Sequence, residues 1–241
     1  MQINPSLLLN EKEGLLHYFS TKKDGNIAFH VEDDEVVVRK NHRLLAEKLS
    51  YNYKKLVHMK QIHSSNVHIV TEKDDFENPP TCDALITNKK NIPLMVMVAD
   101  CSPILLYDPI KKVIAVVHAG RQGAFKNIIG ETLKTMGKRF HCKNENILAS
   151  IGASIGSCCY EVGSEIYDEA QSLHLTHALT KHDKSYFLDV NSILLQQLQE
   201  SGIQNKNIEI SNECSSCLRK KYFSYRAEGQ TGRFSGILMM Y

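Results

Sequence analysis

The stretch VADCSPILLYDPIKKVIAVVHAGRQG (98–123) constrains the fold of this chain more than any other part of the sequence. Two largely apolar runs, 104–107 and 112–117, the second rich in β-branched residues, flank the tetrapeptide DPIK, in which proline pre-sets φ for the second turn position. The pattern predicts an antiparallel hairpin. If the first and last residues of DPIK pair, Cys101 lies directly opposite His118, with Cβ atoms about 4.5–5.5 Å apart. We therefore expect a thiol and an imidazole to meet where the hairpin opens.

This pairing leaves several alternatives open. A bulge would shift the register by one residue, and the proline at the start of the first strand would end the ladder early because it donates no N–H. Cys101 and His118 could be packed core residues, a thiolate nucleophile beside an imidazolium, or two ligands of a metal ion. A catalytic zinc site holds three protein ligands, and by sequence alone the third could be His58, His63 or His68.

A glycine-bracketed loop follows the second strand of the hairpin. Its sequence is Ala119-Gly120-Arg121-Gln122-Gly123, and a helix is expected from residue 124. A strand, such a loop and a helix N-terminus leave backbone N–H groups free to bind an anion. Arg121 could hold a phosphate or carboxylate bidentately. The loop from Gly120 to Gly123 is therefore a candidate anion site.

Outside the hairpin, strands also outnumber helices. Further strands are predicted at 26–38, 67–71, 94–99, 147–151, 207–211 and 236–241. Helices are predicted at 39–50, 124–140, 164–173 and 190–201. Ser164 and Asp189 are the expected caps, and Gly202 an expected stop. Because the strands do not alternate regularly with helices, we predict an α+β fold with a large mixed or antiparallel sheet and flanking helices, formed by residues 1–241 as a single domain.

Composition limits the classes of partner and the cellular location that we expect for this chain. The net charge of +2 gives no electrostatic reason to expect nucleic acid or a membrane. The beginning MQINPSLLLNEKEGLL lacks the pattern of a secretion signal, and no apolar run reaches the ~18 residues of a membrane span, so we expect a cytoplasmic protein.

The cysteines do not suggest a disulfide framework, because there are seven and no secretion signal is apparent. Cys214-x-x-Cys217 has the spacing of half a zinc knuckle, but no second CxxC is present. We therefore expect no structural metal there, and we expect Cys158-Cys159 to pack or to line a pocket.

Short motifs, in one order along nearly the whole chain, resemble those of a known family. They are Phe19-Ser20-Thr21, Gln61-Ile62-His63, Cys82-Asp83-Ala84-Leu85, Ala99-Asp100-Cys101-Ser102-Pro103, His118-Ala119-Gly120, Ile155-Gly156-Ser157-Cys158-Cys159-Tyr160-Glu161-Val162, Leu188-Asp189-Val190-Asn191, Cys214-Ser215-Ser216-Cys217, Tyr222-Phe223-Ser224-Tyr225-Arg226 and Thr231-Gly232-Arg233. The family is the YfiH/laccase-domain family, multi-activity purine nucleoside phosphorylases once called polyphenol oxidases.

The resemblance implies a zinc ion, with copper as an alternative, held by His63, Cys101 and His118. It also implies a mixed-sheet α+β fold and the phosphorolysis of adenosine, inosine, guanosine and methylthioadenosine, with hydrolytic deamination of adenosine. The partners would be purine nucleosides and phosphate, and the protein a monomer or homodimer. Asp100 joins Cys101 and His118 as a catalytic candidate, orienting a metal-bound histidine or carrying a proton. The expected substrate- and phosphate-binding residues are Lys22, Gly120, Arg121, Gly123, Arg226 and Arg233.

The sequence departs from the family pattern around the substrate. The family's Trp-Arg after His-Ala-Gly is Arg121-Gln122 here, its first-motif arginine is Lys22, and the glycine after Gln-Ile-His is Ser64. Lysine keeps the charge but loses the bidentate fork. Three rival functions stay open: amide hydrolysis on a cell-wall precursor, as in relatives known as peptidoglycan editing factors, copper-dependent phenol oxidation, and metal or nucleotide binding without turnover.

Overall fold

The largest sheet of the molecule is mixed. The computed structural model describes residues 6–10 and 12–241, and its largest sheet has the strand order β11-β7-β5-β6-β3-β2. These strands are β2 (Val67–Ile69), β3 (Ala84–Thr87), β5 (Ser102–Asp108), β6 (Val113–Ala119), β7 (Leu148–Ile151) and β11 (Ile208–Ile210). The pairs β2–β3 and β7–β11 are parallel and the other pairs antiparallel. The predicted α+β class with a mixed sheet is confirmed.

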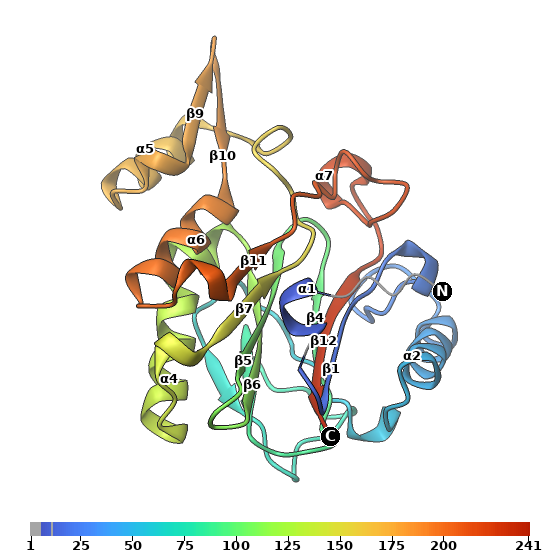
Figure 1. The fold of residues 1–241 in the computed structure, drawn as a ribbon. Helices are drawn as coiled ribbons and strands as arrows, with labels where there is room; N and C mark the ends of the chain where they lie inside the picture. The colour runs from blue at the N-terminus through green and yellow to red at the C-terminus, as the bar shows by residue number, and fades with distance from the viewer. Residues whose placement is uncertain (1–5, 11) are drawn as a thin grey trace.

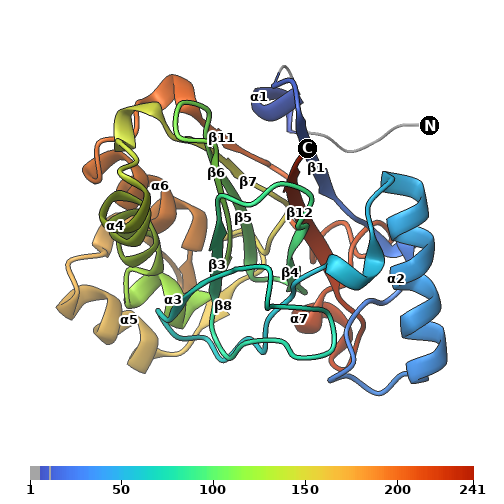
Figure 2. The ribbon, with the colours of Figure 1, turned by 90° about the horizontal axis from the view of Figure 1, so that it is seen from below.

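Both faces of this sheet are covered (Figure 2). On one face packs a sheet of order β1-β12-β4, made of β1 (Leu15–Phe19), β12 (Phe234–Met240) and β4 (Leu94–Val98). On the other face lie α4 (Ile128–Phe140) and α6 (Val190–Glu200), while α2 (Glu35–Leu49) covers the outside of the smaller sheet. Ile104 and Val117 pack on the helical side, whereas Leu105 and Val116 pack between the sheets. This double coverage explains why the strands of the hairpin are apolar without alternation.

A third sheet and one helix form an arm that projects from this core (Figure 1). The arm contains β8 (Glu161–Val162), α5 (Ser164–Ser172), β9 (Leu179–His182) and β10 (Ser185–Leu188), with the sheet order β8-β10-β9. None of its strands was predicted, because each is only two to four residues long and β8 and β9 carry mainly polar side chains. Helix α5 begins at Ser164, but Gly163 rather than Ser164 is its N-cap. The remaining α-helices of the described residues are α1 (Leu7–Asn10), α3 (Arg121–Phe125) and α7 (Tyr225–Glu228).

The hairpin forms, but the expected register is wrong. Pro103, not Cys101, lies opposite His118. The turn has the four residues 109–112 between the strands, and Asp108 Oδ1 holds it by accepting two amide hydrogen bonds of 2.9 Å each. The shift is by two residues, so every side chain keeps its predicted face. Cys101 lies just before β5 and reaches His118 from the strand end.

Two other predicted elements differ from the structure. The strand expected at 26–38 is wrong: its valines open α2, because the Asp34 side chain caps the helix by accepting from Val36 N at 2.8 Å. The helix expected at 124–140 is two helices, α3 and α4, separated at Asn127, which has a left-handed φ of 52° and caps α4. Asp189 does cap α6, as predicted. Strands β1 and β3 were not predicted.

The described residues include no helix with both the length and the apolar content to cross a bilayer. The prediction that the chain has no secretion signal rests on residues 1–16. Of these, residues 1–5 and 11 lie outside the described residues. The assignment of 1–241 to a single domain stays a prediction.

Candidate metal centre

Three segments bring His63, Cys101 and His118 together. His118 lies near the end of β6, Cys101 directly precedes β5, and His63 lies in the loop before β2. One side-chain ligand atom from each lies within 4.8 Å of the others, and Cys101 Sγ is 3.6 Å from His63 Nε2. The competing histidines have other partners: His58 Nε2 is 3.1 Å from a backbone carbonyl oxygen, and His68 Nε2 is 2.7 Å from a carboxylate.

Asp83, a buried carboxylate directly before β3, contacts the ring of His118 and the backbone amide of His63. Its Oδ1 lies 2.8 Å from His118 Nδ1 and accepts from the His63 amide at 3.0 Å. Its Oδ2 accepts from both the amide and the hydroxyl of Ser64, each at 2.7 Å. With His118 Nδ1 donating to the carboxylate, Nε2 is the atom left to bind a ligand. Burial raises the pKa of Asp83, but the hydrogen bonds from His118 and Ser64 outweigh it and hold that pKa at about 2.

The electrostatics of the cluster favour a thiolate. Burial raises the pKa of Cys101, but the neighbouring positive charge of His118 outweighs it and lowers that pKa to about 6. Burial lowers the pKa of His118, yet the Cys101 thiolate and the Asp83 carboxylate raise it to about 9. The thiolate is the form that binds metals, whereas His118 would release its Nε2 proton on doing so.

Gly120 provides the space around these ligand atoms. A Cβ at this position would lie 2.7 Å from Cys101 Sγ and 3.0 Å from His63 Cδ2. Two imidazoles and one thiolate form a donor set that suits zinc and copper alike. The residues therefore fit a metal ion with three protein ligands, and this donor set by itself does not select the metal.

Substituting Gly120→Ala should weaken metal binding. The backbone of Gly120 is extended, with φ −82°, so alanine adds no backbone strain and acts only through its Cβ. We expect the metal affinity to fall by about 10–100-fold, the range seen when the surroundings of metal ligands are altered. Competition with a chromophoric chelator measures this, and Gly137→Ala, whose Cβ would have ordinary contacts, is the control. Equal affinities in the two variants would contradict the packing argument.

The cluster opens into a cavity of about 440 Å³. This volume is within the usual range for small-molecule sites. The cavity is lined by the three cluster residues together with His30, Gln61, Met97, Asp100, Gly120, Arg121, Tyr160, Tyr225, Arg226 and Arg233, among others. Four of the predicted substrate-binding residues, Gly120, Arg121, Arg226 and Arg233, are thus brought together with the cluster.

The three arginines of the cavity differ in their partners. Arg121 forms an ion pair with Glu169 at 2.8 Å. Arg226 donates to the carbonyl of Glu161 at 2.8 Å, and Arg233 donates to the carbonyls of residues 231 and 232. Among the described residues, neither of these two guanidinium groups has a carboxylate within ion-pair distance. Burial also lowers the pKa of Arg233, because desolvation disfavours its charge.

Two predicted residues lie elsewhere, and one has a different partner. Lys22 is not among the cavity-lining residues and pairs with Glu228. Gly123 is buried in α3, where a Cβ would meet the backbone oxygen of His118 at 3.5 Å. Asp100 lines the cavity, but it accepts hydrogen bonds from Ser215 Oγ and the Arg226 amide, at 2.6 and 2.7 Å, rather than from a histidine. Asp83 contacts the His118 ring instead. The only feature of the sequence that drew attention to Asp83 was its place in the motif Cys82-Asp83-Ala84-Leu85.

A comparison with known families gives a match over most of the chain. Residues 17–241 match the family described as "Multi-copper polyphenol oxidoreductase laccase". The chain belongs to this family. Among its curated relatives, a purine nucleoside phosphorylase of Corynebacterium glutamicum is 35% identical over 217 residues, covering 89% of this chain and 86% of the relative. Purine nucleoside phosphorylase YlmD of Bacillus subtilis is 29% identical over 251 residues, covering 96% and 90%.

Solved structures of laccase-family relatives have the same fold. YlmD from Geobacillus stearothermophilus superposes with a TM-score of 0.91 at 26% identity, covering 100% of this chain and 98% of that one. The Bacillus licheniformis protein YfiH gives 0.90 at 29% identity, covering 94% and 93%. The family resemblance inferred from the sequence motifs is confirmed.

Proposed function

We propose that this chain is a metal-dependent purine nucleoside phosphorylase whose active site is the cavity beside His63, Cys101 and His118. One observation carries the proposal: the cavity combines a three-ligand cluster with Arg226 and Arg233, which have no carboxylate within ion-pair distance among residues 6–10 and 12–241. Arg233 is partly buried, and a partly buried cation without a carboxylate is stabilised by an anionic ligand. Arg226 is exposed, and its guanidinium group, like that of Arg233, can bind phosphate bidentately. The names of the curated relatives support the same reaction. Adenosine, inosine, guanosine and methylthioadenosine are the proposed substrates.

In this reaction a phosphate oxygen attacks C1′ of the ribose as the C1′–N9 bond breaks. The electron pair of that bond leaves with the base, which takes up a proton. Arg226 and Arg233 would hold phosphate against the sugar, since catalysis here depends on positioning and charge stabilisation. Asp100, which lines the cavity, is the proposed proton carrier. Zinc held by His63, Cys101 and His118 would supply a Lewis acid and lower the pKa of water.

Hydrolytic deamination of adenosine is a second activity that the same cluster would support. Three protein ligands leave one position of a tetrahedral metal for water, and the cluster faces the cavity. Copper-dependent phenol oxidation has less support, because the three-ligand cluster found among residues 6–10 and 12–241 contains only two histidines.

Incubation of the metal-characterised protein with adenosine, with and without phosphate, separates these activities. Adenine and ribose 1-phosphate that form only with phosphate support phosphorolysis, whereas phosphate-independent inosine indicates deamination. Failure of every purine nucleoside to give product would refute the proposal.

The substitution Arg233→Ala should raise the KM for phosphate more than it lowers kcat. A charge-assisted contact of about 1.5–3 kcal/mol corresponds to about 10–100-fold in affinity. Initial rates at varied phosphate concentration measure the effect, with Arg139→Ala, an exposed arginine of α4, as the control. An unchanged KM for phosphate in Arg233→Ala would remove Arg233 from the site.

A further inference from the structure

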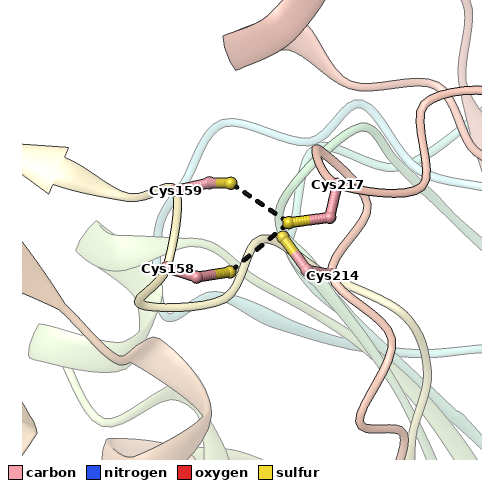
Figure 3. A group of neighbouring side chains, drawn as sticks. All are labelled: Cys158, Cys159, Cys214 and Cys217. Atoms are coloured by element: carbon pink, nitrogen blue, oxygen red, sulfur yellow. Dashed lines mark hydrogen bonds between the residues drawn. The ribbon is translucent and has the colours of Figure 1, made fainter.

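A second group of side chains converges outside the cavity. Cys158 and Cys159 lie in the turn between β7 and β8, and Cys214 and Cys217 lie between β11 and α7. The four sulfur atoms lie within 4.8 Å of one another, and Cys217 Sγ is 3.6 Å from Cys158 Sγ and 3.4 Å from Cys159 Sγ. Figure 3 shows the two pairs of side chains pointing toward a common centre from opposite sides.

The backbone around these cysteines is organised to bring them together. Parallel pairing of β7 with β11 continues in a bridge between Ser154 and Cys214. Gly156 then lets the turn approach closely, since a Cβ there would lie 3.3 Å from Cys158 Sγ. The amide of Gly156 donates to Cys214 Sγ at 3.3 Å. Such a hydrogen bond favours the anionic form of a sulfur ligand.

We propose that Cys158, Cys159, Cys214 and Cys217 bind a Zn²⁺ ion as a closed structural site. Tetrahedral zinc with Zn–S bonds of about 2.3 Å has S···S edges of about 3.8 Å, close to the 3.6 and 3.4 Å that separate Cys217 Sγ from Cys158 Sγ and Cys159 Sγ. Four protein ligands leave no open position, which distinguishes a structural zinc from a catalytic one. The motif Cys214-x-x-Cys217 offers only two ligands by itself, and the adjacent cysteines 158 and 159 supply the other two. The expectation that no structural metal binds at Cys214 and Cys217 is therefore replaced by this proposal.

A disulfide or simple hydrophobic packing would fit this geometry less well. A disulfide brings two sulfurs to about 2.05 Å and leaves each with one partner, whereas Cys217 Sγ is nearly equidistant from two others. Hydrophobic packing does not account for the group, because Cys158 and Cys217 are exposed. Tetrahedral thiolate sites select zinc or iron, and zinc suits a site with no redox role.

The proposed zinc would connect two loops that form the wall of the cavity. Ile155 and Tyr160, on either side of the first cysteine pair, line the cavity, as does Arg226 beyond the second. The Arg226 guanidinium lies 5.0 Å from the Tyr160 ring centroid and so already bridges these loops. Binding energy at a structural metal site contributes to folding, so the zinc would stabilise this wall.

Metal content tests the proposal independently of catalysis. The background is Cys101→Ala, which disables the cavity cluster, and protein is prepared under reducing conditions and freed of loosely bound metal. We expect one zinc per chain in Cys101→Ala. The control Cys101→Ala/Cys142→Ala, which also lacks the buried thiol of Cys142 outside the group, should bind the same amount. Further substitution of Cys214→Ser and Cys217→Ser should abolish zinc binding. Cobalt in place of zinc should give intense thiolate charge-transfer absorption that these serines remove.

Alkylation of the folded Cys101→Ala chain tests the same zinc site without the serine substitutions, which could prevent folding. Zinc should protect residues 158, 159, 214 and 217 together, and a chelator should expose all four to the reagent, as read by peptide mass spectrometry. Reduced Cys101→Ala protein that binds no zinc would overturn the proposal. So would a disulfide within the group or bound iron in place of zinc.

Discussion

Cys101→Ala is expected to remove the cavity metal and nearly all of the catalytic activity. Cys101 supplies the only sulfur of the three-ligand cluster, and its lowered pKa keeps the thiolate available at neutral pH. A bound Lewis acid contributes several kcal/mol to transition-state stabilisation, so kcat/KM for phosphorolysis should fall by about 10²–10⁴-fold. Metal analysis of the same preparations should show the loss of one equivalent of metal per chain.

The matched control for this variant is Cys142→Ala. Cys142 is a buried thiol that packs in the core between the helices and the large sheet, away from the cluster. Its loss should lower stability while leaving metal content and kcat/KM close to those of the wild type. Full occupancy of the cavity metal in Cys101→Ala would refute the ligand assignment, and activity retained without metal would refute the role of the metal.

Asp83→Asn should cause the largest loss of stability of any single substitution at the site. The carboxylate is fully buried and accepts hydrogen bonds from His118 and from the turn around His63 and Ser64. Breaking a buried charged network of this kind costs about 3–5 kcal/mol in free energy of unfolding. Denaturant unfolding of metal-free wild type and variant at neutral pH measures the effect. A difference below about 1 kcal/mol would mean that the network contributes little beyond an ordinary hydrogen bond.

The pH dependence of this difference follows from the two shifted pKa values. Asp83 has a pKa of about 2 in the folded chain against an ordinary 3.8, so its stabilisation is present above pH 3.8 and is lost as pH falls toward 2. His118 has a pKa of about 9 against 6.5, so its stabilisation is present below pH 6.5 and is lost as pH rises through 9. The difference between metal-free wild type and Asp83→Asn should therefore be largest between pH 3.8 and 6.5. A difference that does not vary with pH would contradict the assigned shifts.

Local sequence patterns predicted those parts of the fold that depend on neighbours along the chain. The hairpin was predicted from its apolar runs and turn, and its faces are correct despite the error in register because the shift is by an even number of residues. Asp189 was predicted as a cap from its position before an apolar helix. By contrast, Val36, Val37 and Val38 indicated a strand, and the Asp34 cap made them the first turn of α2.

The candidate sites depend on contacts between segments far apart in the sequence. The spacing of residues along the chain does not reveal these contacts. His63 could not be separated from His58 and His68 without either the family resemblance or the fold. Asp83 reaches His118 because β3 pairs antiparallel with β6, and no feature of its own segment indicates that partner. The second cysteine group likewise assembles only through the parallel pairing of β7 and β11.

Transfer of labelled inorganic phosphate to ribose is the most direct test of the proposed function. Wild-type protein of known metal content is incubated with inosine and ³²P-labelled phosphate, and the sugar phosphate and the free base are quantified together. We predict labelled ribose 1-phosphate in equal amount to hypoxanthine, and formation of both products at least about 100-fold slower with Cys101→Ala. Release of hypoxanthine with unlabelled ribose, or equal label transfer by Cys101→Ala, would contradict metal-dependent phosphorolysis at this cavity.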